Sequence, residues 1–99
     1  PVFEDLVPLD LTVDVYPNPF TELTNIRIHL SDAGPVMLKL YNSVGQEINI
    51  LADRHFEDGT HTVQWDGTDM SGSQLPSGIY IYRLQAGEEV LTGRIQLMR

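Results

Sequence analysis

The sequence predicts an all-β protein that folds as an antiparallel β-sandwich of about seven strands. Apolar and polar side chains alternate in short runs, which is the period of a strand with one buried face. Turn residues separate these runs at intervals of roughly 8–12 positions. Outside one ambiguous segment, no run has a helical period. Two stacked sheets of immunoglobulin-like type fit this pattern, although the Cys-Trp-Cys framework of antibody domains is missing.

Length and composition limit the chain to one small domain. It has 99 residues, of which 41% are hydrophobic, enough for a single compact core. Residues 1–9 mix acids, prolines and scattered apolar side chains without a period, so we expect a linker or lead-in there and the sandwich at residues 10–99. The sequence starts at Pro1, without a charged and then apolar leader, which suggests a fragment of a longer protein.

Charge and cysteine content exclude several classes of function. The net charge of −8, from 14 acidic and 6 basic residues, argues against a nucleic-acid partner, which needs clustered Lys and Arg. Cysteine is absent, which excludes disulfides, thiol catalysis and thiolate metal sites. No apolar run approaches the roughly 20 residues of a transmembrane helix. An acidic chain without cysteine suits an exported bacterial module, but many cytosolic domains share this composition.

The alternation places the strands at definite positions. We expect them at residues 11–16, 25–30, 36–41, 47–51, 61–65, 79–86 and 90–98. The fourth strand is the ambiguous one, because apolar residues between 44 and 56 also recur at helical spacing; Gly45 and the flanking strands favour β-structure. In the last strand, Leu91, Ile95 and Leu97 can face inward.

The stretch from Trp65 to Leu84 organises the rest of the chain. Residues 68–74 are short and polar, which predicts a long turn without a helix. After the turn, aromatic and apolar side chains occupy both alternating positions, which indicates a central strand packed on both faces. Tyr80, near the start of that strand, is placed to make a tyrosine-corner hydrogen bond.

A second landmark is the rigid corner Tyr16-Pro17-Asn18-Pro19-Phe20. Two prolines around an asparagine lack N–H donors and disfavour helix before them, so the first strand must stop there. The aromatic ring of Phe20 directly after the corner is expected to fold back and plug the end of the core.

No constellation of residues predicts catalysis, and we expect a protein that is not an enzyme and has no cofactor. A nucleophile with its base, a carboxylate pair and a histidine cluster are all missing at recognisable spacing. Histidines 29, 55 and 61 fall on different elements, which favours surface positions over a shared metal site. Asp66 and Asp69 offer oxygen ligands for Ca²⁺, but without the EF-hand pattern they are more simply turn-stabilising residues.

Aromatic side chains allow one further alternative, carbohydrate binding. A sugar-stacking platform would need exposed rings on one face, and the candidates are Trp65, Tyr41, Tyr80 and Tyr82. Because three of these lie on strands in apolar alternation, packing in the core is the favoured interpretation.

Five segments together resemble a known group of domains. They are Tyr16-Pro17-Asn18-Pro19-Phe20, Ala33-Gly34-Pro35-Val36, Leu40-Tyr41-Asn42-Ser43-Val44-Gly45-Gln46, His61-Thr62-Val63-Gln64-Trp65-Asp66-Gly67 and Ser77-Gly78-Ile79-Tyr80. With them, the chain from about Val13 to Arg99 resembles the C-terminal type A sorting domains of the type IX secretion system. The same pattern also resembles the immunoglobulin-like domain of flagellar hook-capping proteins, for which Trp65-Asp66-Gly67 is at least as typical.

Membership of the sorting group would imply a role and a set of partners. The domain would lead a Bacteroidota-type protein through the periplasm and across the outer membrane, and would then be cleaved off or hold its cargo at the cell surface. Its partners would be the outer-membrane secretion machinery and a covalently linked N-terminal passenger domain. The machinery would recognise chiefly the last strand, whose exposed edge can be read by strand addition.

The resemblance also assigns roles to individual residues. The sorting signal would consist of Gly78, Tyr80, Gly93, Arg94, Ile95, Gln96, Leu97, Met98 and Arg99. The structural motif of the family would consist of Pro17, Asn18, Pro19, Phe20, Gly45, Trp65, Asp66 and Gly67. The basic ends are arginine where the sorting group commonly has lysine, and Arg94 and Arg99 can also be read as solvated ends of an edge strand. A structural module within a larger assembly, hook-capping-like or a spacer in a surface enzyme, is the alternative function.

Overall fold

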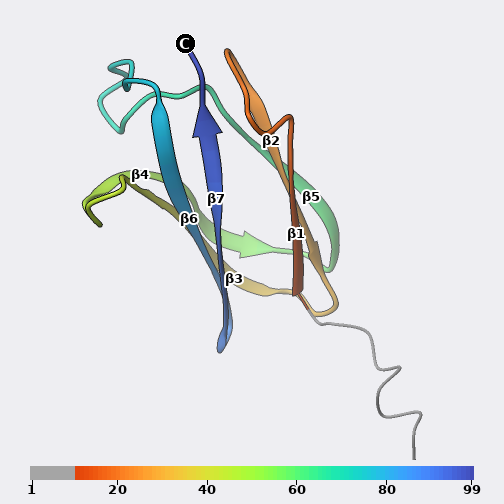
Figure 1. Ribbon diagram of the computed structural model, residues 1–99. Helices are drawn as coiled ribbons and strands as arrows, with labels where there is room; N and C mark the ends of the chain where they lie inside the picture. Colours follow the sequence, from red (N-terminus) through yellow and green to blue (C-terminus); the bar gives the residue numbers. More distant parts are fainter. Residues whose placement is uncertain (1–10) are drawn as a thin grey trace, which may run out of the picture.

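Seven antiparallel strands form two stacked sheets in the computed structural model, which describes residues 11–99 (Figure 1). The strands are β1 (Leu11–Tyr16), β2 (Thr24–Leu30), β3 (Gly34–Tyr41), β4 (Glu47–Phe56), β5 (Gly59–Trp65), β6 (Gly78–Ala86) and β7 (Glu89–Leu97). The predicted all-β, immunoglobulin-like sandwich is confirmed. The expected linker at residues 1–9 and residue 10 lie outside the described part of the chain.

The smaller sheet has the order β1-β2-β5, with β2 in the middle. The alternation of β2 separates two faces, because Ile26, Ile28 and Leu30 are buried while Arg27 and His29 are exposed. This arrangement follows from the two-residue period of a strand, in which successive side chains point to opposite faces. The half-solvated second strand predicted from the sequence is confirmed.

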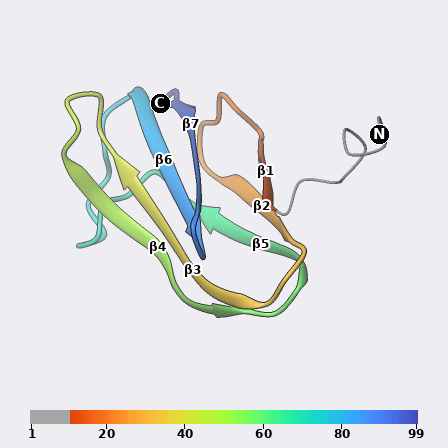
Figure 2. The same ribbon diagram turned by 90° about the horizontal axis from the view of Figure 1, so that it is seen from below.

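The larger sheet has the order β4-β3-β6-β7, so that β6 is an inner strand and β7 is an edge strand. Figure 2 shows β4, β3, β6 and β7 side by side from below. The central position predicted for β6 is confirmed, but the prediction that both its faces are packed is wrong. Tyr80, Tyr82 and Leu84 are buried, whereas Ile79 on the outer face is 37% exposed. Strand periodicity identifies an apolar face but does not show that another layer covers it.

The fourth strand is longer than the sequence predicts. It spans ten residues and ends at Phe56. Its pairing with β3 has two register irregularities, between Leu38 and Lys39 and between Leu40 and Tyr41. An extra residue at such a point shifts which side chains face inward. The strict alternation is therefore lost along β4, which explains why this segment also looked helical.

The core lies between the two sheets and draws side chains from every strand. Its buried members are Leu11, Phe20, Ile26, Ile28, Leu30, Val36, Leu38, Leu40, Ala52, Phe56, Trp65, Tyr80, Tyr82, Leu84, Ile95 and Leu97. No buried side-chain nitrogen or oxygen atom within residues 11–99 lacks a hydrogen-bond partner. Thr24, the buried polar residue, donates its hydroxyl to the carbonyl oxygen of Pro17 at 2.6 Å.

Candidate functional site: the last strand and the end that it closes

Aromatic rings from three distant segments close one end of the sandwich. The ring centroids of Phe20 and Trp65 are 5.3 Å apart, and those of Trp65 and Tyr80 are 5.4 Å apart. All three side chains are buried. Tilted and edge-on pairs at such distances are favourable in addition to the area they bury. The predicted role of Phe20 as a plug is confirmed, and we call Phe20, Trp65 and Tyr80 the aromatic cap.

The polar atoms of the aromatic cap are satisfied by the loop that precedes β6. The Tyr80 hydroxyl donates to the carbonyl oxygen of Pro76 at 2.6 Å, which is the predicted tyrosine-corner bond. The indole N–H of Trp65 donates to the carbonyl oxygen of Thr68 at 2.9 Å. Burial raises the pKa of Tyr80, an effect that the nearby Arg99 guanidinium opposes. Both hydrogen bonds tie the loop at residues 66–77 to the core.

The proline corner covers part of the outer edge of β7. The Asn18 side chain donates to the Arg94 carbonyl oxygen at 2.8 Å and accepts from the Gln96 N–H at 2.9 Å. The Phe20 N–H donates to the Gln96 carbonyl oxygen at 2.9 Å, and the Phe20 carbonyl oxygen accepts from the Met98 N–H at 2.8 Å. The corner therefore acts as a short parallel strand against β7. Asn18 belongs to the predicted family motif, but its contact with β7 cannot be predicted, because nothing local in the sequence indicates it.

Arg99 is a structural clamp as well as a surface charge. Its Nε atom donates to the Leu75 carbonyl oxygen at 2.8 Å, and its Nη2 atom donates to the Gly67 carbonyl oxygen at 2.8 Å. Its backbone N–H donates to the Ser77 hydroxyl oxygen at 2.8 Å. Arg99 is exposed, as expected for a solvated strand end, but these hydrogen bonds also fix it to the loop before β6. Leu75 and Ser77 are partners that the sequence did not indicate.

Glycine is required at position 67 beneath that clamp. Gly67 is buried and has a φ of +80°, in the left-handed region that side chains disfavour. A Cβ atom there would lie 2.5 Å from Arg99 Nη2 and 3.2 Å from a Leu97 methyl group. The Trp65-Asp66-Gly67 segment thus joins the aromatic cap to the C-terminal clamp.

The residues assigned to the sorting signal differ in how far they are buried. Tyr80, Ile95 and Leu97 are buried, and Gly93 also belongs to the inward side, where the ring of Tyr82 lies across it and leaves no room for a Cβ atom. Gly78 begins β6 opposite Leu97. Three further residues, Arg94, Gln96 and Met98, are exposed. We call Arg94, Gln96 and Met98 the outward row; Arg99, which is also exposed, is held in the clamp described above.

A shallow hollow of about 420 Å³ lies beside the outward row. It is lined by Asn18, Pro19, Ile79, Arg94 and Gln96. The proline ring and Ile79 supply apolar surface, while the arginine and the two amides supply charge and hydrogen-bonding groups. The hollow therefore joins the proline corner, the outer face of β6 and the last strand in one accessible surface.

The loop aspartates stabilise turns. Asp69 Oδ1 accepts hydrogen bonds from the Ser71 hydroxyl at 2.7 Å and from the Ser71 and Ser73 N–H groups at 3.0 Å each. These bonds hold the pKa of Asp69 below its ordinary value, with the Ser71 hydroxyl as the largest cause. Asp66 accepts from the Thr68 hydroxyl at 2.6 Å. No group of three or more His, Cys, Asp and Glu residues in the described chain has the geometry of a metal site.

The histidines lie on three different strands, near or at the surface, and His55 and His61 both contact Glu57. His29 is exposed and contacts the Thr60 hydroxyl at 3.2 Å, while His61 packs on the ring of Phe56. His55 Nε2 lies 3.4 Å from a carboxylate oxygen of the exposed Glu57. The proposed sugar platform is also wrong, because Trp65, Tyr80 and Tyr82 are buried. Packing of these rings in the core, the favoured interpretation, is confirmed for all three.

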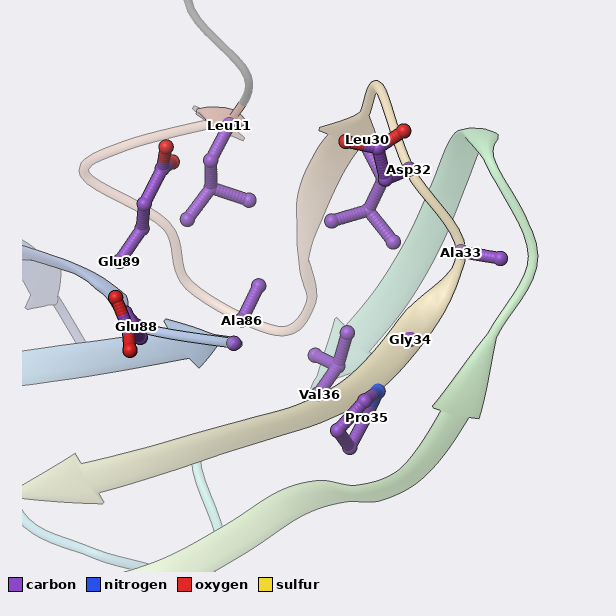
Figure 3. Close-up of a pocket in the computed structure, with 11 residues that line it drawn as sticks. Leu11, Leu30, Asp32, Ala33, Gly34, Pro35, Val36, Ala86, Glu88 and Glu89 are labelled. Carbon is purple, nitrogen blue, oxygen red and sulfur yellow. The ribbon is translucent and has the colours of Figure 1, made fainter.

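Within residues 11–99, the opposite end of the sandwich is open. A cavity of about 370 Å³ lies between the ends of the sheets, near the β6–β7 turn (Figure 3). Leu11, Leu30, Val36 and Ala86 line its apolar part. Its rim carries the carboxylates of Asp32, Glu88 and Glu89, which gives this end a negative charge. Within residues 11–99, no helix is long and apolar enough to span a bilayer.

Two solved structures contain a domain with this fold. One is dimeric latent PorU from Porphyromonas gingivalis, with a TM-score of 0.71, 19% identity and coverage of 88% of this chain and 9% of PorU. The other is PorZ, an essential surface component of the type IX secretion system of the same bacterium, with a TM-score of 0.57, 22% identity and coverage of 88% of this chain and 11% of PorZ. The chain thus corresponds to about a tenth of each protein. At these identities the similarity shows the fold alone.

Sequence comparison identifies the family. No curated protein matches the chain. The family model of the FlgD Ig-like domain matches residues 20–89, from the plug residue Phe20 to the first residue of β7. The match includes the aromatic cap and most of both sheets, but it leaves out β1 and the outward row. The chain belongs to the FlgD Ig-like domain family.

Proposed function

We propose that this domain is a non-catalytic C-terminal sorting and cell-surface attachment module of a protein exported by a type IX secretion system. Its partners are the outer-membrane secretion machinery and an N-terminal passenger domain in the same chain. The route runs through the periplasm and the outer membrane, and the final location is the cell surface or the medium. The partner recognises the outward row of β7 together with the adjacent hollow.

The main support for this proposal is that β7 has one buried face and one exposed face. Its inward residues Ile95 and Leu97 fix the strand in the core, while Arg94, Gln96 and Met98 remain available to a partner. The proline corner and the Arg99 clamp hold this surface in place from two sides. A rigid surface loses little conformational entropy on binding, which suits recognition.

Comparison with PorZ supports the cellular setting, because PorZ acts in type IX secretion at the bacterial surface and contains a domain of this fold. The placement of the histidine and hydroxyl side chains within residues 11–99 supports a non-catalytic role. The one contact in residues 11–99 between a histidine and a hydroxyl group joins exposed His29 and Thr60 on an open sheet face. Such a face neither excludes water nor assembles further polar groups around a substrate.

The test is to fuse the domain to a secreted passenger in a type IX-competent host and measure passenger at the surface and in the medium. Deleting residues 95–99 would remove core side chains, so a loss of export would reflect unfolding. The variant Arg94→Ala/Gln96→Ala/Met98→Ala instead changes only exposed side chains. The matched control Thr62→Ala/Gln64→Ala changes exposed residues of β5 on the other sheet.

We expect the β7 variant to reduce export at least about tenfold, corresponding to roughly 1.4 kcal/mol of lost recognition, while the control exports normally. The two purified domains should melt at the same temperature as the parent. Equal export by the β7 variant and its control would refute the proposal.

A structural module in a larger assembly is the second candidate, and the family match favours it specifically. The match covers the body of the sandwich and omits β7, as expected if the shared function is structural. The two candidates differ in the position of the domain within the parent protein. A gene that codes for a further folded domain after Arg99 would favour the structural module over the sorting signal.

A further inference from the structure

The outer edge of β7 is occupied along only half of its length. β6 and β7 pair without a register shift, with Ile95 opposite Tyr80 and Gly93 opposite Tyr82. The backbone groups of the even-numbered residues 94, 96 and 98 point away from β6, since the proline corner bonds to them. Alternation along a regular strand gives the N–H and C=O groups of Thr92 and Val90 the same outward direction.

The other half of this edge, Val90 to Thr92, is unpaired within residues 11–99. β6 is the sole strand that pairs with β7 in the described chain, and the contacts of the proline corner reach no further than Arg94. Unpaired strand edges are templates for another strand, and proteins usually block them with charges, bulges or proline. Here the acidic Glu88 and Glu89 precede the edge, but Val90 is 42% exposed and Thr92 is uncharged.

We propose that an extended segment of the outer-membrane partner adds to β7 at Val90–Thr92, in line with the strand-like segment that already covers residues 94–98. This inference rests on the proposed sorting function, for which it supplies the mode of binding. The edge of β7 already pairs with a short strand-like segment of the proline corner. The added segment would lie along the same edge, next to that segment.

The neighbouring side chains define the chemistry of that segment. Val13 on β1 and Leu91 on β7 are partly buried hydrophobic residues on the edge strands of the two sheets. An apolar side chain that points inward from the new strand would lie beside Leu91, on the inward side of β7. Glu88 in the β6–β7 turn and Glu89 at the start of β7 are exposed acids, and they favour a basic residue beside the apolar one. Asp14 on β1 is also exposed, but it already pairs with Arg27 at 3.4 Å. The expected partner segment is therefore extended, with an apolar residue next to a lysine or arginine.

A proline substitution tests the inference directly. Thr92→Pro removes an N–H group that is unpaired in the domain, and proline is compatible with an edge strand whose N–H faces solvent. Thr92→Ala changes the side chain but keeps the N–H group, which makes it the matched control. In the passenger fusion, we expect Thr92→Pro to reduce export at least about tenfold relative to Thr92→Ala. Equal export by two folded variants would overturn the inference.

Hydrogen exchange provides a second measurement that needs no substitution. Isotope-labelled domain is mixed with outer-membrane vesicles from a type IX-competent host, or with vesicles from a strain that lacks the system. With vesicles from the competent host, we expect the amides of Val90 and Thr92 to exchange at least about tenfold more slowly than in the free domain. Vesicles from the strain that lacks the system should not slow this exchange. Unprotected amides would overturn strand addition, whatever the behaviour of the proline variant. Failure of the sorting function itself would be recognised separately, as passenger export that does not depend on the domain.

Discussion

The two ends of the sandwich are built in opposite ways. At the C-terminal end, the aromatic cap fills the space between the sheets, and the proline corner and Arg99 tie the surrounding loops together. At the other end, aliphatic side chains and three carboxylates surround a cavity of about 370 Å³. The motif residues Phe20, Trp65 and Gly67 all gather at the closed end. The family motif thus mainly encodes how one end of the sandwich is sealed and how the last strand is held.

The largest expected effect comes from opening the closed end. Trp65→Ala removes the ring that contacts both Phe20 and Tyr80, and it leaves a cavity in the core. We expect a loss of about 3–5 kcal/mol in the free energy of unfolding. Urea denaturation measures it. Leu30→Ala, beside the existing cavity at the open end, should lower the free energy of unfolding by less. Equal losses for the two variants would mean that the closed end is no more tightly packed than the open end.

A second comparison uses the same substitution at both ends. Gly67→Ala places a Cβ atom at φ +80° against Arg99 and Leu97, so we expect a loss of about 1–3 kcal/mol. Gly34→Ala is its control, because a Cβ atom on Gly34 would have no atom within 4 Å. Thermal melting of both variants should show a clear decrease for position 67 only. A Gly67→Ala variant as stable as the parent would show that the Arg99 side chain can move aside without loss of stability.

Removing the tyrosine-corner hydrogen bond should lower the free energy of unfolding less than Trp65→Ala or Gly67→Ala does. Tyr80→Phe keeps the ring of the aromatic cap and removes the hydroxyl that donates to Pro76. We expect a loss of about 1 kcal/mol, the usual net value of such a bond. Tyr41→Phe, at a half-buried tyrosine on β3, is the matched control and should be nearly neutral. Equal losses in urea denaturation would mean that the Pro76 bond has no special role.

The smallest expected effect depends on pH. The hydrogen bonds from Ser71 and Ser73 lower the pKa of Asp69 in the fold, so its carboxylate stabilises the domain above the ordinary aspartate pKa of 3.8. This contribution is lost as the pH falls through the lowered pKa. Asp69→Ala should therefore reduce the melting temperature near pH 7 and have a smaller effect as the pH falls below 3.8.

Asp32→Ala, at the rim of the open end, is the control for this pH series and should have a smaller effect near pH 7. A pH-independent decrease for Asp69→Ala would mean that its carboxylate charge is not what stabilises the loop.

The accuracy of the sequence analysis differs between elements for a physical reason. Strand positions such as Leu11–Tyr16 were predicted exactly, because alternation is local and has one period. The end of β4 was predicted five residues too early, because its register irregularities disturb that period. For β6, both faces are apolar in the sequence, yet Ile79 is exposed. Burial depends on whether a second layer covers a face, which local sequence does not contain.

The sequence by itself determined the class of fold, the strand order along the chain and the identity of the plug residue, since these follow from periodicity, turn chemistry and a rigid corner. Only the tertiary structure decided which strand edges are paired. The contact of Asn18 with β7 and the clamp of Arg99 on Gly67 join residues that are far apart in the chain. Such long-range hydrogen bonds leave no local pattern, because each partner forms them only after the two sheets have packed together.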